Sequence, residues 1–257
     1  MKKGSFIIWG SLVILILSSM ILSHKETGVI KSPEQAIEKS FVLMELFTSQ
    51  GCSSCPPADE LLGKYALLHD DHIIPLAFHV DYWNRLGWTD SFSNARFSQR
   101  QQDYAGKLGL QSVYTPQLII NGQEEMVGSD EQKIAASVKR QLAEKVTANI
   151  QINSTKFTGN TVHIYYTLNN MNGHESVQGA LVQQEASTHI RAGENRGLKM
   201  KNYNVVRDFV SIPVKKKEGE LVLTFPSAII TTGYSIVLFV QDNKSRKIAD
   251  AIYSKVN

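Results

Sequence analysis

Cys52 and Cys55 are the only cysteines of this 257-residue chain, and two serines separate them. Cysteines at this spacing form a redox-active disulfide, supply half of a metal site or close a small structural loop. A purely structural disulfide is disfavoured. By loss of loop entropy in the unfolded chain, so short a ring would stabilise the fold by only about 2 kcal/mol, against about 3 kcal/mol for a 15-residue loop. The spacing therefore favours a reactive pair or a metal site.

Metal binding has weaker support in the sequence than redox chemistry. There is no second Cys-x-x-C motif and the seven histidines are scattered, so four ligands for structural zinc are hard to assemble. Copper(I) held by both thiolates and His79 is a remaining alternative, because soft thiolate ligands suit this ion. A redox pair needs no metal and no other cofactor, since thiolate exchange itself carries the chemistry.

Cys52 is the expected nucleophile, because it stands between a predicted strand and a predicted helix. The nearly continuous apolar run 40–48 is typical of a strand buried on both faces, and Pro56 and Pro57 are typical of a helix start. A thiolate near a helix N-terminus is stabilised by free N–H groups and the helix dipole, which lower its pKa from about 8.5. Cys55 shares the helix face of Cys52 and would resolve the mixed disulfide.

A second predicted strand, 72–80, leads to two further candidates at its end. In a parallel sheet, His79 and Asp81 would emerge at the same edge as Cys52, where such sheets build sites. His79 would stabilise the thiolate or move protons, and Asp81 would tune it. The alternative for His79 is a packed, hydrogen-bonded core residue.

Glu45, Thr115 and Pro116 complete the candidate catalytic residues. Glu45 lies inside the first predicted strand, where a buried carboxylate would accept the proton of Cys55 as this thiol attacks; a partly exposed or paired glutamate is the alternative. Thr115 and Pro116 stand directly before the third predicted strand, where a thioredoxin fold places a cis-proline facing its Cys-x-x-C pair. A trans proline at a strand start is the alternative, but the order of the surrounding elements favours the cis-proline.

The segment 81–92 has no clean periodicity and predicts a loop rich in large aromatic side chains. Trp83, Trp88 and Phe92 would form an apolar rim that binds a substrate chain. Packing of these side chains into the core is the alternative.

The predicted elements follow the order strand, helix, strand, helix, hairpin, helix up to residue 145, and change to β segments separated by turns beyond it. The predicted fold is therefore an α/β thioredoxin-like domain, 41–145, followed by an all-β, immunoglobulin-like sandwich domain, 146–257. The expected elements of the first domain, besides its two strands, are helices 56–70, 93–109 and 129–145 and the hairpin 115–129, which turns at Asn121-Gly122.

Residues 1–24 predict a signal peptide or an N-terminal membrane anchor. Lys2 and Lys3 precede the uncharged run Phe6–Leu22, which is longer than a typical h-region of about 7–15 residues and just short of the roughly 20 of a comfortable span. The end of this run matches the small-x-small motif of signal-peptide cleavage sites poorly, which favours an uncleaved anchor. The polar residues 25–40 predict a linker. We therefore expect an extracytoplasmic protein, periplasmic or secreted, attached to the inner membrane through this apolar run.

The charge balance gives no support for nucleic-acid binding. The chain has 27 Lys and Arg against 24 Asp and Glu, so 25 basic residues remain once Lys2 and Lys3 are set aside. For a redox pair, the expected substrates are protein thiols or disulfides, or small thiols, and an unidentified redox partner recycles the cysteines.

Five separated segments of the chain form a recognisable series: ELFTSQGCSSCPPAD, PLAFHVDYWNRLGWTDSFS, RQQDYAGKLG, VYTPQLIINGQ and RAGENRGLKMKNYNVVRDF. In this order they closely resemble the secreted thioredoxin-like family called domain of unknown function 1223, from about Phe41 to the C-terminus. The resemblance implies a thioredoxin-like domain joined to a β-rich domain in exported bacterial proteins. It implies that Cys52 and Cys55 stand at the redox position and that Pro116 is the cis-proline facing Cys52. It implies no substrate.

The last of these segments, 191–209, is polar and by itself predicts a solvated loop before a strand. The resemblance suggests instead that it has a role at the interface with the first domain.

The leading hypothesis is an exported thiol–disulfide oxidoreductase in which Cys52 attacks, Cys55 resolves and Pro116 holds the partner chain. The alternatives are a copper(I)-binding or protein-interaction module on the same scaffold, and a scaffold whose disulfide is never turned over.

Overall fold

The computed structural model describes Met1 and residues 38–147, 149–170, 172–226 and 232–256. Apart from Met1, the described residues belong to one compact unit, Ala36–Asn257. The apolar run Phe6–Leu22 and most of the expected linker lie outside the described residues. Within the described part of the chain, no helix is long and apolar enough to cross a membrane.

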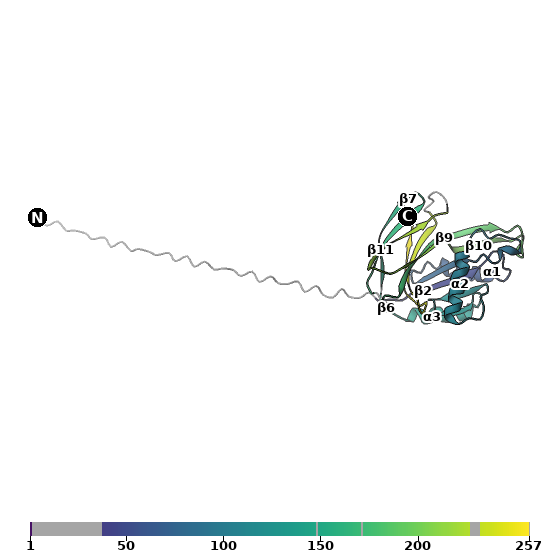
Figure 1. Ribbon diagram of the computed structural model, residues 1–257, viewed down its shortest axis with the longest axis horizontal. Coiled ribbons are helices and arrows are strands. Elements are labelled where there is room, and N and C mark those ends of the chain that lie inside the picture. The colour runs from purple at the N-terminus through teal and green to yellow at the C-terminus, as the bar shows by residue number, and fades with distance from the viewer. Residues whose placement is uncertain (2–37, 148, 171, 227–231, 257) are drawn as a thin grey trace. The chain divides into compact units, whose positions relative to one another are not determined.

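An eight-stranded mixed sheet, in the order β13-β12-β9-β10-β3-β2-β4-β5, runs through this unit. The helices lie together at one end of the unit, and β7 and β11 lie at the other (Figure 1). The described strands are β1 (Glu38–Lys39), β2 (Val42–Thr48), β3 (Ile73–His79), β4 (Gln117–Ile120), β5 (Glu124–Val127), β6 (Val146–Thr147), β7 (Ile150–Thr158), β8 (Thr161–Leu168), β9 (Glu175–His189), β10 (Lys199–Pro213), β11 (Glu218–Thr224), β12 (Tyr234–Asp242) and β13 (Ile248–Lys255). The described helices are α1 (Pro56–Leu67), the 3-10 turn η1 (Asn84–Leu86), α2 (Ala95–Leu108) and α3 (Glu131–Ala143).

Strands β2 and β3 are parallel neighbours inside the sheet, with Thr48 opposite His79 at their carboxyl ends. Every side chain of both strands is buried. One face of β2, which carries Leu43 and Phe47, packs in a cluster with α2, and the other face, which carries Met44, packs with α1 and α3. The prediction of two strands buried on both faces is therefore confirmed.

Local sequence signals set the ends of the helices. The helix α1 begins with Pro56 and Pro57, whose fixed φ suits a first helical turn. Asn94 caps α2 by accepting a hydrogen bond from a backbone N–H of the first turn, and Gly109, with φ 68°, follows its last residue in the left-handed conformation. Asp130 caps α3 in the same way as Asn94 caps α2.

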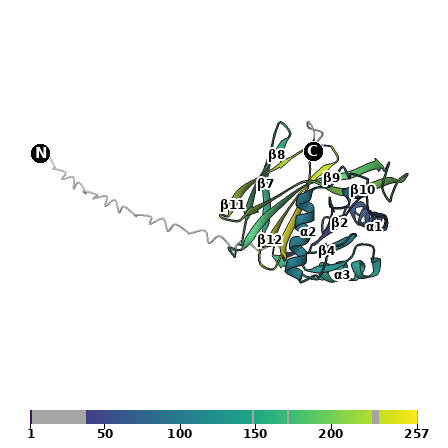
Figure 2. The ribbon, with the colours of Figure 1, turned by 45° about the vertical axis from the view of Figure 1, so that its right-hand side comes forward.

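The expectation of an α/β thioredoxin-like domain followed by a separate immunoglobulin-like sandwich is wrong. Strand β3 lies between β2 and β10 and pairs in parallel with β10, where Ala77 is opposite Val205. Strands from both halves of the sequence therefore form one sheet. Helix α2 lies over the middle of this sheet (Figure 2), on an apolar cluster that contains Phe47 from the first half and Phe209 from the second. The reason for the error is that alternating apolar residues show that a strand is buried, not which strand it pairs with.

The three-stranded sheet β11-β8-β7 packs on one face of β9 and β12 of the large sheet. Side chains such as Ile164 and Leu221 meet Leu181 and Leu238 of the large sheet in a second apolar cluster. The two layers approach closely at Gly179, where an added Cβ would lie 2.5 Å from a methyl group of Leu221. The expected sandwich is therefore formed by this small sheet and part of the large sheet, and it is not a separate domain.

Strands β9 and β10 continue beyond their pairing with β3 and run past α1 (Figure 1). We call residues 185–203, with the turn between the strands, the hairpin arm. Tyr203 of the arm packs on α1 at Gly63, where an added Cβ would lie 2.4 Å from the tyrosine ring. The segment 191–209, predicted as a solvated loop, thus supplies the tip of the arm and most of β10.

Candidate active site

Cys52 and Cys55 form a disulfide at the junction between β2 and α1, with Cα atoms 5.4 Å apart. Cys55 is the N-cap residue of α1. The two residues after it are prolines, which have no N–H, so the helix end offers fewer donors to a thiolate than a normal first turn. The Ser54 hydroxyl, 3.3 Å from the Cys52 sulfur, is a polar group placed to stabilise that thiolate instead.

Thr115 and Pro116 lie against the disulfide, and the peptide bond between them is cis. The Thr115 carbonyl oxygen lies 3.8 Å from Cys52 Sγ and accepts a hydrogen bond from Ser54 Oγ at 3.4 Å. The Thr115 hydroxyl oxygen accepts a hydrogen bond from Trp83 Nε1 at 2.8 Å. The structure therefore places Thr115 beside Cys52 and Trp83 beside Thr115, while the roles of Thr115, Pro116 and Trp83 in a reaction stay predictions.

The three candidate aromatic residues, Trp83, Trp88 and Phe92, are half-buried. Trp88 donates a hydrogen bond from Nε1 to Gln50 Oε1 at 3.1 Å. Phe92 packs edge-on against the His79 ring, with ring centroids 5.3 Å apart. Trp83 and Trp88 therefore bind residues next to the cysteines, and Phe92 packs beside the buried His79. Only the exposed parts of these side chains are open to a partner.

His79 is fully buried and pairs with Asp90, a carboxylate that the sequence analysis missed. His79 Nδ1 lies 2.7 Å from Asp90 Oδ2, and the same oxygen accepts a hydrogen bond from Gln50 N at 2.8 Å. Burial by itself would lower the pKa of His79, but the adjacent Asp90 raises it above its ordinary value. Burial would raise the pKa of Asp90, but His79 and the backbone hydrogen bonds hold it below its ordinary value. Each residue therefore stabilises the charged form of the other, and the pair is connected to the residues just before Cys52 through Gln50.

Asp81 and Glu45 point toward α2 and away from the disulfide. Asp81 accepts a hydrogen bond from Ser98 Oγ at 2.5 Å. Glu45 is fully buried and binds Arg100 through both oxygens, at 2.5 and 2.9 Å. Glu45 lies on the α2 face of β2, whereas the helix that follows Cys55 covers the opposite face. Glu45 is therefore the paired glutamate of the alternative interpretation.

The tip of the hairpin arm covers the cysteine loop. Asn195 donates hydrogen bonds from Nδ2 to the carbonyl oxygens of Gln50 and Cys52, both at 2.9 Å. Glu194 accepts a hydrogen bond from Ser53 N at 3.2 Å. Both cysteine side chains are 0% exposed beneath this cover. The arm therefore contacts the cysteine loop of the first half, although the two halves are not the separate domains that the resemblance implied.

Asp59, Asp90 and Asn195 are residues of this site that the sequence analysis did not identify. Asp59 on α1 is only 4% exposed, although its position in the first helical turn predicts an ordinary solvated acid. Asp90 has a local signal, since its side chain accepts a hydrogen bond from Phe92 N in an Asx-type turn. Asn195 has none, because its partners lie 145 and 143 residues away in the chain.

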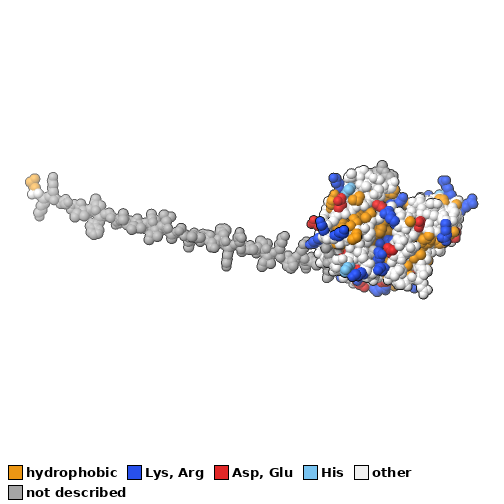
Figure 3. All heavy atoms as spheres, viewed as in Figure 1, with side chains coloured by type: hydrophobic (Ala, Val, Ile, Leu, Met, Phe, Trp, Pro, Cys, Tyr) orange, Lys and Arg blue, Asp and Glu red, His pale blue; other side chains and the backbone are white. Residues whose placement is uncertain are grey.

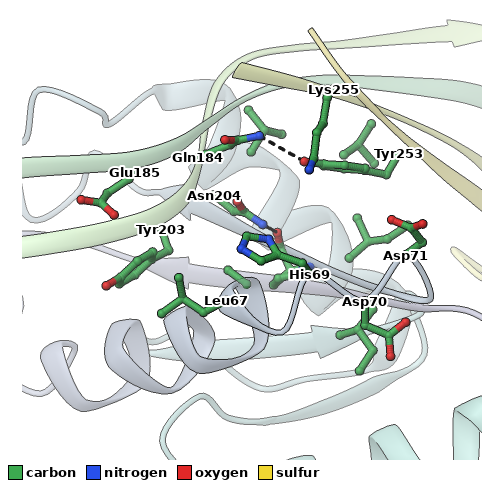
Figure 4. Close-up of a pocket in the computed structure, with 16 residues that line it drawn as sticks. Leu67, His69, Asp70, Asp71, Gln184, Glu185, Tyr203, Asn204, Tyr253 and Lys255 are labelled. Atoms are coloured by element: carbon green, nitrogen blue, oxygen red, sulfur yellow. Dashed lines mark hydrogen bonds between the residues drawn. The ribbon is translucent and has the colours of Figure 1, made fainter. Parts of the chain in front are cut away.

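A cavity of about 310 Å³ lies at the other end of α1, between the loop after this helix and strands of the second half (Figure 4). His69, Tyr203, Tyr253 and Lys255 are among its lining residues, and the cysteines are not. On the face of the molecule shown in Figure 3, basic, acidic and hydrophobic side chains are intermixed. Among the described residues, no group of three or more His, Cys, Asp or Glu side chains could hold a metal ion.

A family model described as "Protein of unknown function (DUF1223)" matches residues 43–241. The match extends from β2 into β12 and includes the disulfide, Pro116 and the hairpin arm. The chain belongs to this family. The DUF1223 match therefore covers both halves of the eight-stranded sheet.

Two solved structures resemble this DUF1223 member over most of its length. Protein AGR_C_4864 from Agrobacterium tumefaciens is 31% identical with a TM-score of 0.63, and the match covers 86% of this chain and 97% of that one. HBP35 of Porphyromonas gingivalis is 14% identical with a TM-score of 0.58, over 86% of this chain and 77% of that one, which shows similarity of fold alone. No curated protein matches the chain.

Proposed function

We propose that this protein is a thiol–disulfide oxidoreductase that uses the Cys52–Cys55 pair on disulfides or thiols of other proteins. The observation that carries the proposal is the surroundings of the Cys52 sulfur. It lies at the start of a helix, 3.3 Å from the Ser54 hydroxyl and 3.8 Å from the Thr115 carbonyl oxygen. A hydroxyl donor stabilises a thiolate, and a second cysteine within the same turn resolves the intermediate.

The reaction transfers two electrons by two exchange steps. In the reduced protein, the Cys52 thiolate attacks one sulfur of a substrate disulfide, that bond breaks, and the first substrate thiolate leaves. The Cys55 thiolate then attacks Cys52 Sγ, the bond between Cys52 and the substrate breaks, and the second substrate thiolate leaves. The pair is oxidised to the disulfide and the substrate is reduced; the reverse sequence oxidises a substrate dithiol.

Burial of both sulfurs supports a macromolecular substrate over a small one. With the hairpin arm in place neither cysteine side chain is exposed, so a partner has to displace part of the cover to reach the sulfur. A protein chain that binds beside Thr115 and the half-buried Trp88 would supply the binding energy for this displacement.

The test is capture of the intermediate. A Cys55→Ser variant, expressed in the full chain, should accumulate mixed disulfides between Cys52 and partner proteins that disappear on reduction of a non-reducing gel sample. The Cys52→Ser/Cys55→Ser variant is the matched control and should show none. Absence of trapped species with the first variant, together with a reduction potential below about −300 mV and no exchange with glutathione, would show an inert disulfide.

We also propose an extracytoplasmic location, periplasmic or secreted. Disulfides persist in oxidising compartments, and the N-terminal lysines followed by Phe6–Leu22 are typical of an export segment. Fractionation followed by N-terminal sequencing of the protein would decide between a cleaved signal and a retained anchor. Recovery of the full-length chain in the cytoplasm would contradict the proposal.

A further inference from the structure

Asp59 is a buried carboxylate that forms no salt bridge among the described residues, although the nearby His79 lowers its pKa. It is 4% exposed, and within the described part of the chain neither of its oxygens has a hydrogen-bond partner of good geometry. Burying such a group without a hydrogen bond or a cation is costly. An unpaired buried acid beside a reactive pair of cysteines therefore points to a functional role.

Asp59 stands on α1 one helical turn after the resolving cysteine, on the same helix face. Asp59 follows Cys55 by one helical turn, and its N–H donates a hydrogen bond to the Cys55 carbonyl oxygen at 3.1 Å. Residues four apart lie on one helix face, and helical side chains point toward the N-terminus. The Asp59 side chain therefore covers the turn that contains Cys55.

The strands beneath α1 add polar groups that face Asp59. Thr48 and His79 are opposite each other at the ends of β2 and β3, and the Thr48 hydroxyl and His79 Nε2 have no hydrogen-bond partner among the described residues. Burial raises the pKa of Asp59 to about 7; His79 and then Thr48 lower it, while Asp90 and Glu60 raise it.

His79 itself faces Asp90, Asp59 and, more weakly, Arg207 from β10, which lowers the pKa of the imidazole. These are the charged groups around the carboxylate. They leave it able to take up and release a proton near neutral pH, as a general base must.

We propose that Asp59 is the catalytic residue that accepts the proton of the Cys55 thiol when this cysteine resolves the mixed disulfide. The inference rests on the proposed function of the pair. The S–H bond of Cys55 breaks, its proton moves to the Asp59 carboxylate, and the resulting thiolate forms the bond to Cys52 Sγ. The bond between Cys52 and the substrate breaks, its electron pair leaves with the substrate sulfur, and Asp59 later releases the proton to water.

The test separates the two exchange steps. The reduced full-length protein is mixed in a stopped-flow instrument with an aromatic disulfide whose released thiolate absorbs visible light. The first equivalent of thiolate is released by Cys52 at a rate proportional to reagent concentration, and the second by Cys55 at a rate independent of it. Asp59→Asn should leave the first phase unchanged and slow the second by about 10- to 100-fold.

The pH profile distinguishes a proton acceptor from a structural residue. In the wild-type protein the second phase should rise with pH through an inflection near the pKa of Asp59, about 7. Asp59→Asn should remove this inflection, and Asp59→Glu should restore it. Glu60→Gln, which removes an exposed carboxylate from the next position, is the matched control: it should keep the second phase and the inflection, displaced slightly to lower pH because Glu60 raises the pKa of Asp59.

The outcomes separate the inference from the proposed function. Equal second phases with the same pH profile in wild type and Asp59→Asn would overturn the role of Asp59 while leaving the oxidoreductase intact. A wild-type protein that releases no second equivalent would overturn the function itself. Thermal unfolding of each variant at the assay pH confirms that it is folded.

Discussion

Glu45 and Asp59 are both buried carboxylates, and their neighbours set their properties. Glu45 binds the Arg100 guanidinium with both oxygens, so the pair resembles a neutral unit within the core. Asp59 has no direct salt bridge among the described residues; His79 lowers its pKa, but burial outweighs this effect and raises the pKa to about 7. The charge on Asp59 therefore changes near neutral pH.

Asp59→Asn should stabilise the oxidised protein above neutral pH. The folded-state pKa of Asp59 lies above the unfolded value, so the folded protein binds the extra proton and loses stability as pH rises toward 7. Removing the charge should raise the free energy of unfolding by on the order of 2–4 kcal/mol at about pH 8, and by much less at about pH 5. Urea unfolding at both pH values measures the difference, with Glu60→Gln as control. Equal changes at both pH values would contradict this account.

The His79–Asp90 ion pair should have a stability window in the mildly acidic range. The raised pKa of His79 contributes stability below its unfolded value, and that contribution is lost as pH rises through the folded value. The lowered pKa of Asp90 contributes stability above its unfolded value, which is lost as pH falls. His79→Gln should therefore cost the most near about pH 5.5, on the order of 1–3 kcal/mol, and less near about pH 9. An unfolding series over this range checks the shape of the dependence.

At the scale of elements, the hairpin arm connects the second half of the sequence to the cysteine loop. Its contacts are a pair of hydrogen bonds from Asn195, one from Ser53 N to Glu194 and one from Gln50 Nε2 to Thr188 Oγ1 at 3.0 Å. These bonds fix the backbone on either side of Cys52. The arm therefore holds the loop in position.

Asn195→Ala should loosen this cover. Two buried carbonyl oxygens lose their donor, which should lower the free energy of unfolding by about 1–3 kcal/mol. Because the sulfurs become accessible, the disulfide should exchange with glutathione faster than in wild type. Asn153→Ala, in the distant three-stranded sheet, removes an exposed side-chain hydrogen bond to Thr167 and is the control. An exchange rate equal to wild type in the Asn195 variant would mean that the arm does not limit access.

At the scale of the whole molecule, one apolar cluster joins both halves of the chain. Arg100 lies over the rings of Phe78, Phe209 and Phe239, and donates a hydrogen bond to Gln241 in addition to its pair with Glu45. Removal of the second half would expose this buried ion pair and the edge of β3. The similarity to protein AGR_C_4864 over 97% of that chain agrees with a unit that recurs as a whole.

A fragment that ends at residue 145 should therefore not fold by itself. The exposed edge of β3 and the uncovered apolar cluster should make it aggregate or remain without fixed tertiary structure. The measurement is near-ultraviolet circular dichroism and amide-exchange protection, compared between the fragment 38–145 and the longer chain 38–257. A fragment with native-like protection would show that the first half is an independent domain.

Much of the local structure was accessible from the sequence, because its signals act over a few residues. The buried strands, the start of α1 at Pro56 and the hairpin at Asn121-Gly122, where both residues have positive φ, followed from apolar runs and turn residues. The approach of Thr115 to Cys52 was predicted only with the help of the element order and the family resemblance.

The sequence by itself determined that Cys52 and Cys55 stand between a buried strand and a helix start. Only the tertiary structure decided that β10 pairs with β3, that Asn195 holds the cysteine loop and that Asp59, not Glu45, lies on the side of Cys55. The physical reason is that periodicity encodes which residues are buried, whereas the identity of a buried group's partner depends on contacts between distant segments. The charge of a buried carboxylate depends on that partner, so its chemistry becomes visible only when the chain is folded.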